Sequence, residues 1–165
     1  MIIVLFGKTG SGKSFIANIL HKDYGFPYLE GDSFFTDEMM AIINKGGVIS
    51  QELRDEFVHS MIAATLQAER DHDNVVLAQL FLSDKNRRQV QQSIPEAIWI
   101  YVDVTPHIRF SRLQARKGHF ADIDYAKKMD VRFEPITIGC QKINNDRNAG
   151  HIKSQLNAIL GGGKP

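Results

Sequence analysis

One eight-residue segment near the N-terminus constrains the fold of this chain more than any other feature. It reads Gly-Lys-Thr-Gly-Ser-Gly-Lys-Ser over residues 7–14, directly after the apolar run Ile2–Phe6. Its glycines let the backbone adopt positive φ and turn several amides towards one point. That point lies at the start of a predicted helix, residues 13–22, whose dipole favours a phosphate. The segment therefore predicts a P-loop, a phosphate-binding turn between a strand and a helix.

Each position of this loop has an expected role. Lys13 is predicted to reach the β- and γ-phosphates of ATP as a catalytic group, and the Ser14 hydroxyl to be a ligand of Mg²⁺. The alternative is a solvated glycine turn capped by Ser11, and the strand and helix on either side argue against it. The expected nucleotide-binding residues of the loop are Gly7, Lys8, Thr9, Gly10, Ser11, Gly12, Lys13 and Ser14.

The order of predicted elements indicates the fold class. Strands are expected at residues 2–6, 27–30, 74–80, 97–103 and 136–140, and helices at 13–22, 37–44, 51–70, 84–92, 106–116 and 149–160. This alternation predicts an α/β P-loop NTPase fold, with a parallel sheet of about five strands and helices on both faces. The chain has 165 residues and no linker or repeat, so we expect a single P-loop domain over residues 1–165.

Charge and hydropathy limit the classes of partner. The formal net charge is +1, so no strong field draws the protein to nucleic acid or to an anionic membrane. The longest apolar runs are too short to span a bilayer, and the N-terminus lacks the pattern of a secretory signal. Cys140 stands alone, which suits a reducing compartment, and its apolar surroundings predict a buried thiol. We therefore expect a cytoplasmic protein.

Two acidic residues follow the second predicted strand. Glu30 and Asp32 lie where ligands of open α/β sheets bind, and their spacing lets them face one side of an extended segment. Glu30 is predicted to hold Mg²⁺ through a water, and Asp32 to bind the acceptor hydroxyl and act in catalysis. The alternative is that Asp32 merely caps the next helix. No aspartate closes the strand at 74–80 to serve as a Walker B acid, which favours the catalytic interpretation.

Two arginines and a polar segment predict a lid. Arg112 and Arg116 share a face of the helix at 106–116, where one could stack on adenine and the other stabilise the transferring phosphoryl group. The alternative is a solvated basic helix end. Gly118 offers a hinge for a mobile lid over residues 117–134, in which His119 is expected to contact the substrate.

These segments resemble a known family. The stretch from residue 111 to residue 120 is similar to the start of the lid in bacterial gluconokinases, which belong with shikimate kinase among the small P-loop kinases. Glu30-Gly31-Asp32 takes the place of that family's Asp-Gly-Asp, Glu134-Pro135 matches the Glu-Pro that closes its lid, and Arg54 falls on one of its arginines. The resemblance follows nearly the whole chain in the order of elements, and it implies ATP-dependent phosphoryl transfer to a hydroxyl.

The chain departs from that family where the family binds its acceptor. Residues 33–36 read Ser-Phe-Phe-Thr in place of a His-Pro, and the segment after the third strand also differs. Phe34 and Phe35 either favour a less polar acceptor or pack in the core. Arg87 or Arg88 either holds an anionic acceptor group or lies on a helix surface. The resemblance therefore supports the ATP site more than it supports gluconate.

Three functions remain open at this point. The leading hypothesis is a kinase for a small metabolite, for example a sugar acid such as gluconate, with substrate-binding residues Asp32, Arg54, Arg87 and His119. The second is a kinase for a nucleoside, a nucleotide or a polynucleotide end. The third is a protein that binds ATP and hydrolyses it slowly or not at all. The expected partners are ATP and a small-molecule acceptor, without membrane or nucleic acid, and a homodimer stays open.

Overall fold

The protein is built around one parallel sheet. The computed structural model describes residues 1–115 and 121–161. The strands are β1 (Ile2–Phe6), β2 (Tyr28–Glu30), β3 (Val75–Gln79), β4 (Ile98–Asp103) and β5 (Gln141–Asn144), in the spatial order β2-β3-β1-β4-β5. Every neighbouring pair is parallel, so helical crossovers must connect the strands.

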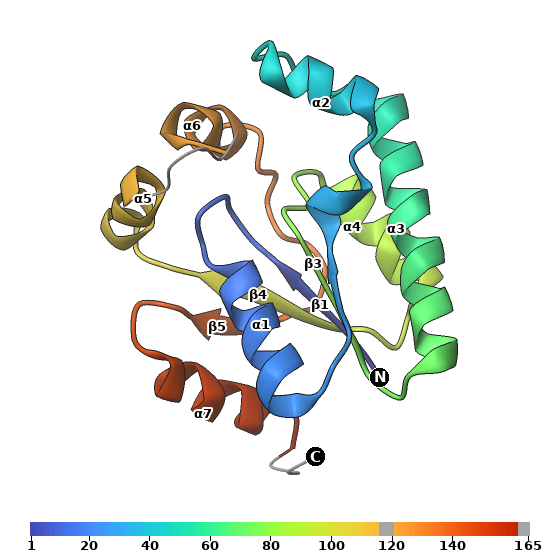
Figure 1. The fold of residues 1–165 in the computed structure, drawn as a ribbon, viewed down its shortest axis with the longest axis vertical. Coiled ribbons are helices and arrows are strands. Elements are labelled where there is room, and N and C mark those ends of the chain that lie inside the picture. Colours follow the sequence, from blue (N-terminus) through green and yellow to red (C-terminus); the bar gives the residue numbers. More distant parts are fainter. Residues whose placement is uncertain (116–120, 162–165) are drawn as a thin grey trace.

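Helices cover both faces of the sheet, as the alternating pattern predicted. They are α1 (Lys13–Tyr24), the short 3₁₀ turn η1 (Gly31–Phe34), α2 (Asp37–Asn44), α3 (Gln51–Asp71), α4 (Asp84–Ser93), α5 (Pro106–Ala115), α6 (Ile123–Asp130) and α7 (Ala149–Ile159). Figure 1 shows α1 and α7 on one face of the sheet and α3 and α4 on the other. In the same view α2, α5 and α6 surround its upper end. The α/β P-loop fold is confirmed.

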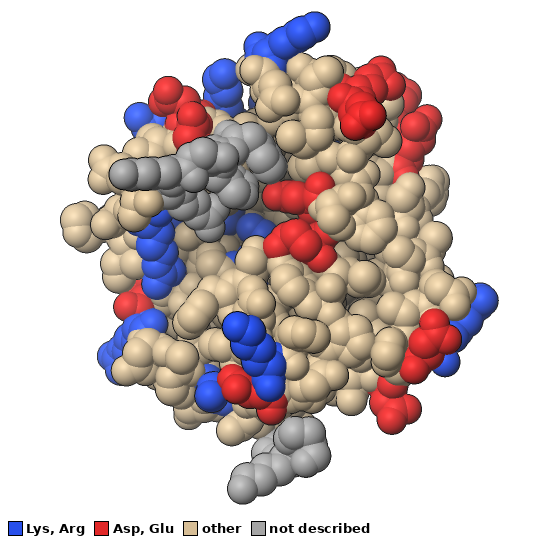
Figure 2. Space-filling view, in the orientation of Figure 1, with Lys and Arg blue, Asp and Glu red and all other residues tan. Residues whose placement is uncertain are grey.

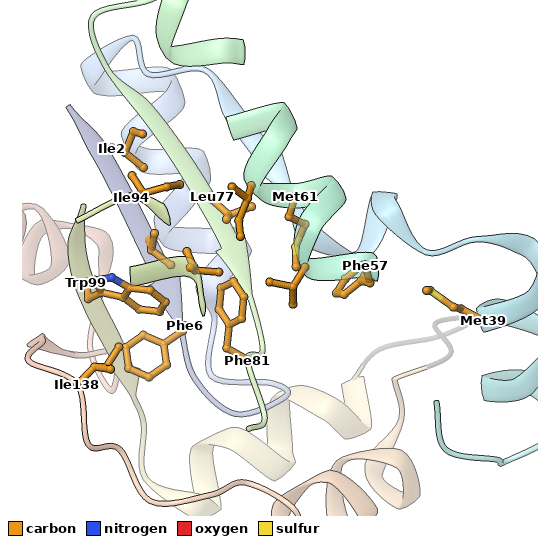
Figure 3. Close-up of a cluster of buried hydrophobic side chains, with 14 residues drawn as sticks. Ile2, Phe6, Met39, Phe57, Met61, Leu77, Phe81, Ile94, Trp99 and Ile138 are labelled. Carbon is orange, nitrogen blue, oxygen red and sulfur yellow. The ribbon is translucent and has the colours of Figure 1, made fainter. Parts of the chain in front are cut away.

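The core has two parts because side chains alternate along each strand. From β1, Ile2, Val4 and Phe6 join a cluster with residues of α3 and α4, whereas Ile3 and Leu5 join a cluster with residues of α1 and α7. All five residues are buried, as expected for a central parallel strand. Figure 3 follows the first cluster from Ile2 and Trp99 towards Phe57 and Met39.

The last strand lies later in the chain than the sequence predicted. Residues 136–140 were expected to form it, but β5 begins at Gln141 and, among the described strands, pairs only with β4. As an edge strand it buries only Ile143, so it lacks the continuous apolar run that marks an inner strand. The apolar Ile136 and Ile138 belong to the preceding connection, where they pack on the first core cluster. Cys140 is exposed, so its predicted burial was wrong.

The polar segment predicted as a lid contains a helix that the sequence analysis did not foresee. The N-cap of this helix, α6, is Asp122, whose side chain accepts a hydrogen bond of 2.8 Å from the amide of Tyr125. Ala126 and Met129 are its buried residues. None of the helices formed by the described residues is both long and apolar enough to cross a membrane.

Candidate active site

The loop between β1 and α1 has the backbone of a phosphate-binding turn. Gly7, Gly10 and Gly12 all have positive φ, and Gly12 is the N-cap of α1. A Cβ at Gly12 would lie 2.0 Å from Asn145 Nδ2, so only glycine fits there. The Lys13 ammonium donates to the Gly7 carbonyl at 2.9 Å and thereby folds its side chain over the loop. The predicted P-loop geometry is present.

A cavity of about 370 Å³ extends from this loop towards α2 and α3. Its P-loop end is lined by Thr9, Gly10, Gly12, Lys13 and Ser14, and the acidic pair Glu30 and Asp32 stands beside it. The cavity therefore brings the predicted phosphate loop and the predicted acidic pair together.

Figure 2 shows the charges on the face viewed in Figure 1. Acidic and basic groups are interspersed there, and neither sign dominates.

Ser14 and Glu30 form a direct contact. The Ser14 hydroxyl donates to Glu30 Oε2 at 2.7 Å, and the Tyr28 hydroxyl donates to the same oxygen. Burial, with the bond to Glu30, raises the pKa of Tyr28, so this group stays a neutral donor. A hydroxyl and a carboxylate beside a phosphate loop fit Mg²⁺, which usually takes one or two protein oxygens together with phosphate and water. The described residues contain no cluster of three or more acidic, His or Cys side chains that could hold a metal ion by themselves.

Asp32 lies in η1 at the edge of the cavity. Its Oδ1 accepts a hydrogen bond of 3.4 Å from Gln79 Nε2, at the end of β3. Gln79 is buried, and its own Oε1 accepts from the amide of Leu80. The cap of α2 is Thr36, whose hydroxyl accepts from the amide of Met39. The alternative role of Asp32 as a cap of α2 is therefore absent.

The predicted arginines occupy different environments. Arg54 lines the cavity and donates to the Ile49 carbonyl at 3.0 Å, and burial lowers its pKa. Arg112 lies beside the P-loop and donates to the Asn145 carbonyl at 2.8 Å. Arg116, Gly118 and His119 lie outside the described residues.

Arg87 does not line the cavity, so its predicted contact with the acceptor is not seen. Its side chain is fully buried, and its guanidinium donates to the carbonyls of Ser83, Leu82 and Glu134. These bonds make it a structural support of the connection between β3 and α4. Its neighbour Arg88 pairs at 2.7 Å with Asp84.

Glu134 is joined to this connection and to the first turns of α4 by three of its groups. Its amide donates to the Leu82 carbonyl at 3.0 Å, and its carboxylate accepts from the Asp84 amide at 2.6 Å. Its carbonyl accepts from Arg87 at 2.8 Å. One end of the predicted lid is therefore fixed to the segment that follows β3.

Two residues that support the site were missed by sequence reasoning. Asn145, which is 1 % exposed, donates from Nδ2 to the Ser11 carbonyl at 2.7 Å and so connects the end of β5 to the P-loop. Its place at the carboxyl end of a strand was the available signal. Arg109 forms a two-bond ion pair with Asp130, which ties α5 to α6. Spacing alone does not reveal that contact.

Comparisons with known proteins agree with this architecture. The solved structures that resemble the chain include a sugar kinase from Janibacter sp. HTCC2649, with a TM-score of 0.82, 20% identity and coverage of 97% of this chain and 94% of that one. A gluconokinase from Sinorhizobium meliloti 1021 gives a TM-score of 0.79 at 19% identity, covering 96% of this chain and 90% of that one.

A third similar structure is the Mycobacterium tuberculosis APS kinase CysC in complex with AMPPNP and APS. Its TM-score is 0.67 at 19% identity, with coverage of 97% of this chain and 96% of that one. At these identities the three structures establish the fold. No match was found among the curated proteins. The family model described as AAA domain matches residues 3–134, which include the P-loop, the acidic pair and the cavity wall. The chain therefore belongs to the AAA domain family of P-loop proteins.

Proposed function

We propose that this protein is an ATP-dependent phosphotransferase that moves the γ-phosphoryl group of ATP to a hydroxyl of a small molecule. The observation that carries the proposal is a continuous cavity that joins the P-loop to Asp32 and extends beyond it. A site of this shape has room for phosphates at one end and an acceptor at the other. The similar structures named as a sugar kinase, a gluconokinase and an APS kinase support the same class of reaction.

The proposed reaction uses side chains of the cavity together with the two arginines predicted from the sequence. The acceptor oxygen attacks the γ-phosphorus, the bond to the ADP oxygen breaks, and Asp32 orients the hydroxyl and takes its proton. Lys13 stabilises the charge on the β- and γ-phosphates, while Arg112, beside the P-loop, acts with Arg116 on the transferring group. Ser14 and Glu30 would hold Mg²⁺, which when bound neutralises part of the phosphate charge.

A coupled assay of ADP release tests the proposal. The screen should contain sugar acids, shikimate-like polyols, aromatic hydroxy acids, nucleosides and nucleotides, and gluconate belongs in it because of the structural neighbours. We expect one class to stimulate ADP release strongly. Tight ATP binding without stimulation by any acceptor would instead favour the ATP-binding protein of the third hypothesis.

The variant Lys13→Ala adds a test of the phosphate site. It should abolish most phosphoryl transfer and weaken ATP binding, since the ammonium lies on the loop itself. Lys22→Ala, an exposed position near the end of the same helix, is the matched control and should behave like the wild type. Wild-type turnover in Lys13→Ala would refute the assignment of the P-loop.

A further inference from the structure

The cavity beyond Asp32 is walled mainly by hydrocarbon. Apolar side chains reach it from the η1–α2 connection, α2, the α2–α3 connection, α3, the segment after β3, and α6. Representative members are Phe35, Ile43, Val48, Phe57, Phe81 and Met129. Because these residues come from six parts of the chain, the apolar wall belongs to the tertiary structure of the site and is not a local sequence run.

Phenylalanine rings form part of this wall. The Phe35 and Phe57 rings are stacked, with centroids 4.7 Å apart and planes 15° apart. Phe81 has a left-handed backbone, with φ of 47°, and its ring lies against Trp99 in the core. Figure 3 shows Phe57 and Phe81 in the core cluster that reaches this wall. A polyhydroxylated molecule would place hydroxyls against these rings, which offer no conventional hydrogen-bonding groups, and such burial is unfavourable.

The polar groups of the cavity are divided between its two ends. Among the described residues that line it, the charged ones are Lys13, Glu30, Asp32 and Arg54. The first three belong to the phosphate end. Of these four residues, Arg54 is therefore the one that could bind a charged group of the acceptor on the side of α3. Its guanidinium makes one hydrogen bond, to the Ile49 carbonyl, and no ion pair with any described residue. A half-buried guanidinium with unused donors fits a carboxylate or another oxyanion.

Two other polar side chains of the wall are already hydrogen-bonded within the protein. Gln79 bonds to Asp32 and to the Leu80 amide, and Asn86 donates to Asp55 at 2.9 Å. Burial, with the nearby Asp32 charge, raises the pKa of Tyr125 to about 12, so this hydroxyl stays neutral near pH 7. The described residues of the wall thus offer one cation, Arg54, few spare hydrogen-bonding groups and a large apolar surface.

We infer that the acceptor is an alcohol with an apolar body and a single anionic group, with its hydroxyl at Asp32 and its anion on Arg54. The inference rests on the proposed function, because it assigns the acceptor of that same site. It differs from a polyhydroxylated sugar acid, which has the same charge and lacks the apolar body. The two features, body and charge, can therefore be tested separately.

Three probes separate them. Para-hydroxymethylbenzoate has both the apolar body and the carboxylate, para-methylbenzyl alcohol lacks the charge, and gluconate lacks the apolar body. Binding of each to the protein saturated with AMP-PNP is measured by calorimetry, and ADP release is measured separately with ATP. We expect para-hydroxymethylbenzoate to bind about tenfold or more tightly than para-methylbenzyl alcohol, as loss of a charged hydrogen bond implies. We expect a preference of about the same size over gluconate, as loss of apolar burial implies.

Two variants with matched controls assign the effect to residues. Arg54→Gln should remove the preference for the carboxylate probe over the neutral alcohol, whereas Arg70→Gln, near the far end of the same helix, should keep it. Val48→Asn should weaken binding of the two aryl probes relative to binding of gluconate. Val131→Asn, at an exposed position, should leave that ratio of affinities unchanged. All four variants should keep the wild-type affinity for AMP-PNP, which shows that they are folded.

The outcomes distinguish this inference from the proposed function. Gluconate binding and turnover stronger than those of para-hydroxymethylbenzoate would overturn the inference and leave the kinase proposal intact. Arg54-dependent binding of the aryl acid without ADP release from any acceptor would support the ligand class and refute the kinase. Failure of the aryl acid to bind while AMP-PNP binds would overturn the inference, whatever the turnover with other alcohols.

Discussion

The amide of Asn145 offers a sharp test of how the P-loop is held in place. The change is Asn145→Ala, which removes the donor to the Ser11 carbonyl. Asn145 is almost fully buried, so water cannot easily replace the lost bond. Its backbone carbonyl, which accepts from Arg112, remains in the variant. The substitution therefore removes one buried contact between the end of β5 and the phosphate loop.

The expected magnitude follows from the burial of the group that loses its partner. Leaving a buried carbonyl without a donor costs about 1–3 kcal/mol in the free energy of unfolding. For a domain of this size, each kcal/mol lowers the melting temperature by about 2–4 °C. ATP affinity should fall as well, by about tenfold if 1.4 kcal/mol of that energy is needed to order the loop around phosphate.

Asn18→Ala is the matched control. The Asn18 side chain also donates from Nδ2 to a backbone carbonyl, that of Ser14, at the same distance of 2.7 Å, but it is exposed. Surface changes of this kind usually alter stability by less than about 0.5 kcal/mol. Melting temperature by calorimetry and ATP affinity by titration measure both effects. Equal and small losses in the two variants would refute the view that Asn145 holds the loop.

Three other predictions concern the chemistry and the proposed lid. Asp32→Asn should lower kcat by about 10²-fold or more with little change in ATP affinity, and near-normal turnover in an ADP-release assay would remove Asp32 from the chemistry. Glu30→Gln should raise the Mg²⁺ concentration needed for half-maximal activity, and an unchanged Mg²⁺ titration would contradict its metal role. Amides of residues 121–134 should exchange faster in the empty protein than with AMP-PNP and acceptor, because few of their side chains are buried. Core-level protection already present in the empty protein would exclude a lid.

Local patterns were sufficient to predict most of the fold. β1 and the glycine loop were predicted together because their signals are local: an apolar run, a glycine-rich turn and the start of a helix follow one another directly in the sequence. Most helix ends also fell within a few residues of their predicted positions. β5 was misplaced because an edge strand buries only Ile143 and shows little apolar signal. The sequence could not indicate which of two neighbouring segments pairs with β4.

The supports of the site were harder to predict, since they join residues far apart in the chain. Asn145 contacts a loop 134 positions earlier, and no spacing rule connects the two. Arg87 was proposed for the acceptor, but a carbonyl 47 positions later, that of Glu134, helps to hold it inside the protein. Residue type suggested an anion site, whereas the packing of two distant segments decided the role.

The attachment of Glu134 has a consequence for the order of kinetic events. The connection after β3 carries Leu80, Phe81 and Leu82 in the cavity wall, and the same connection holds the end of the proposed lid. An acceptor that contacts this wall would therefore also affect the position of the proposed lid, the segment expected to close over the nucleotide. We expect acceptor and ATP to raise each other's affinity by an equal factor, since such coupling is reciprocal at equilibrium. Release of the two products would then be coupled as well, because dissociation of the phosphorylated acceptor would lower the affinity for ADP.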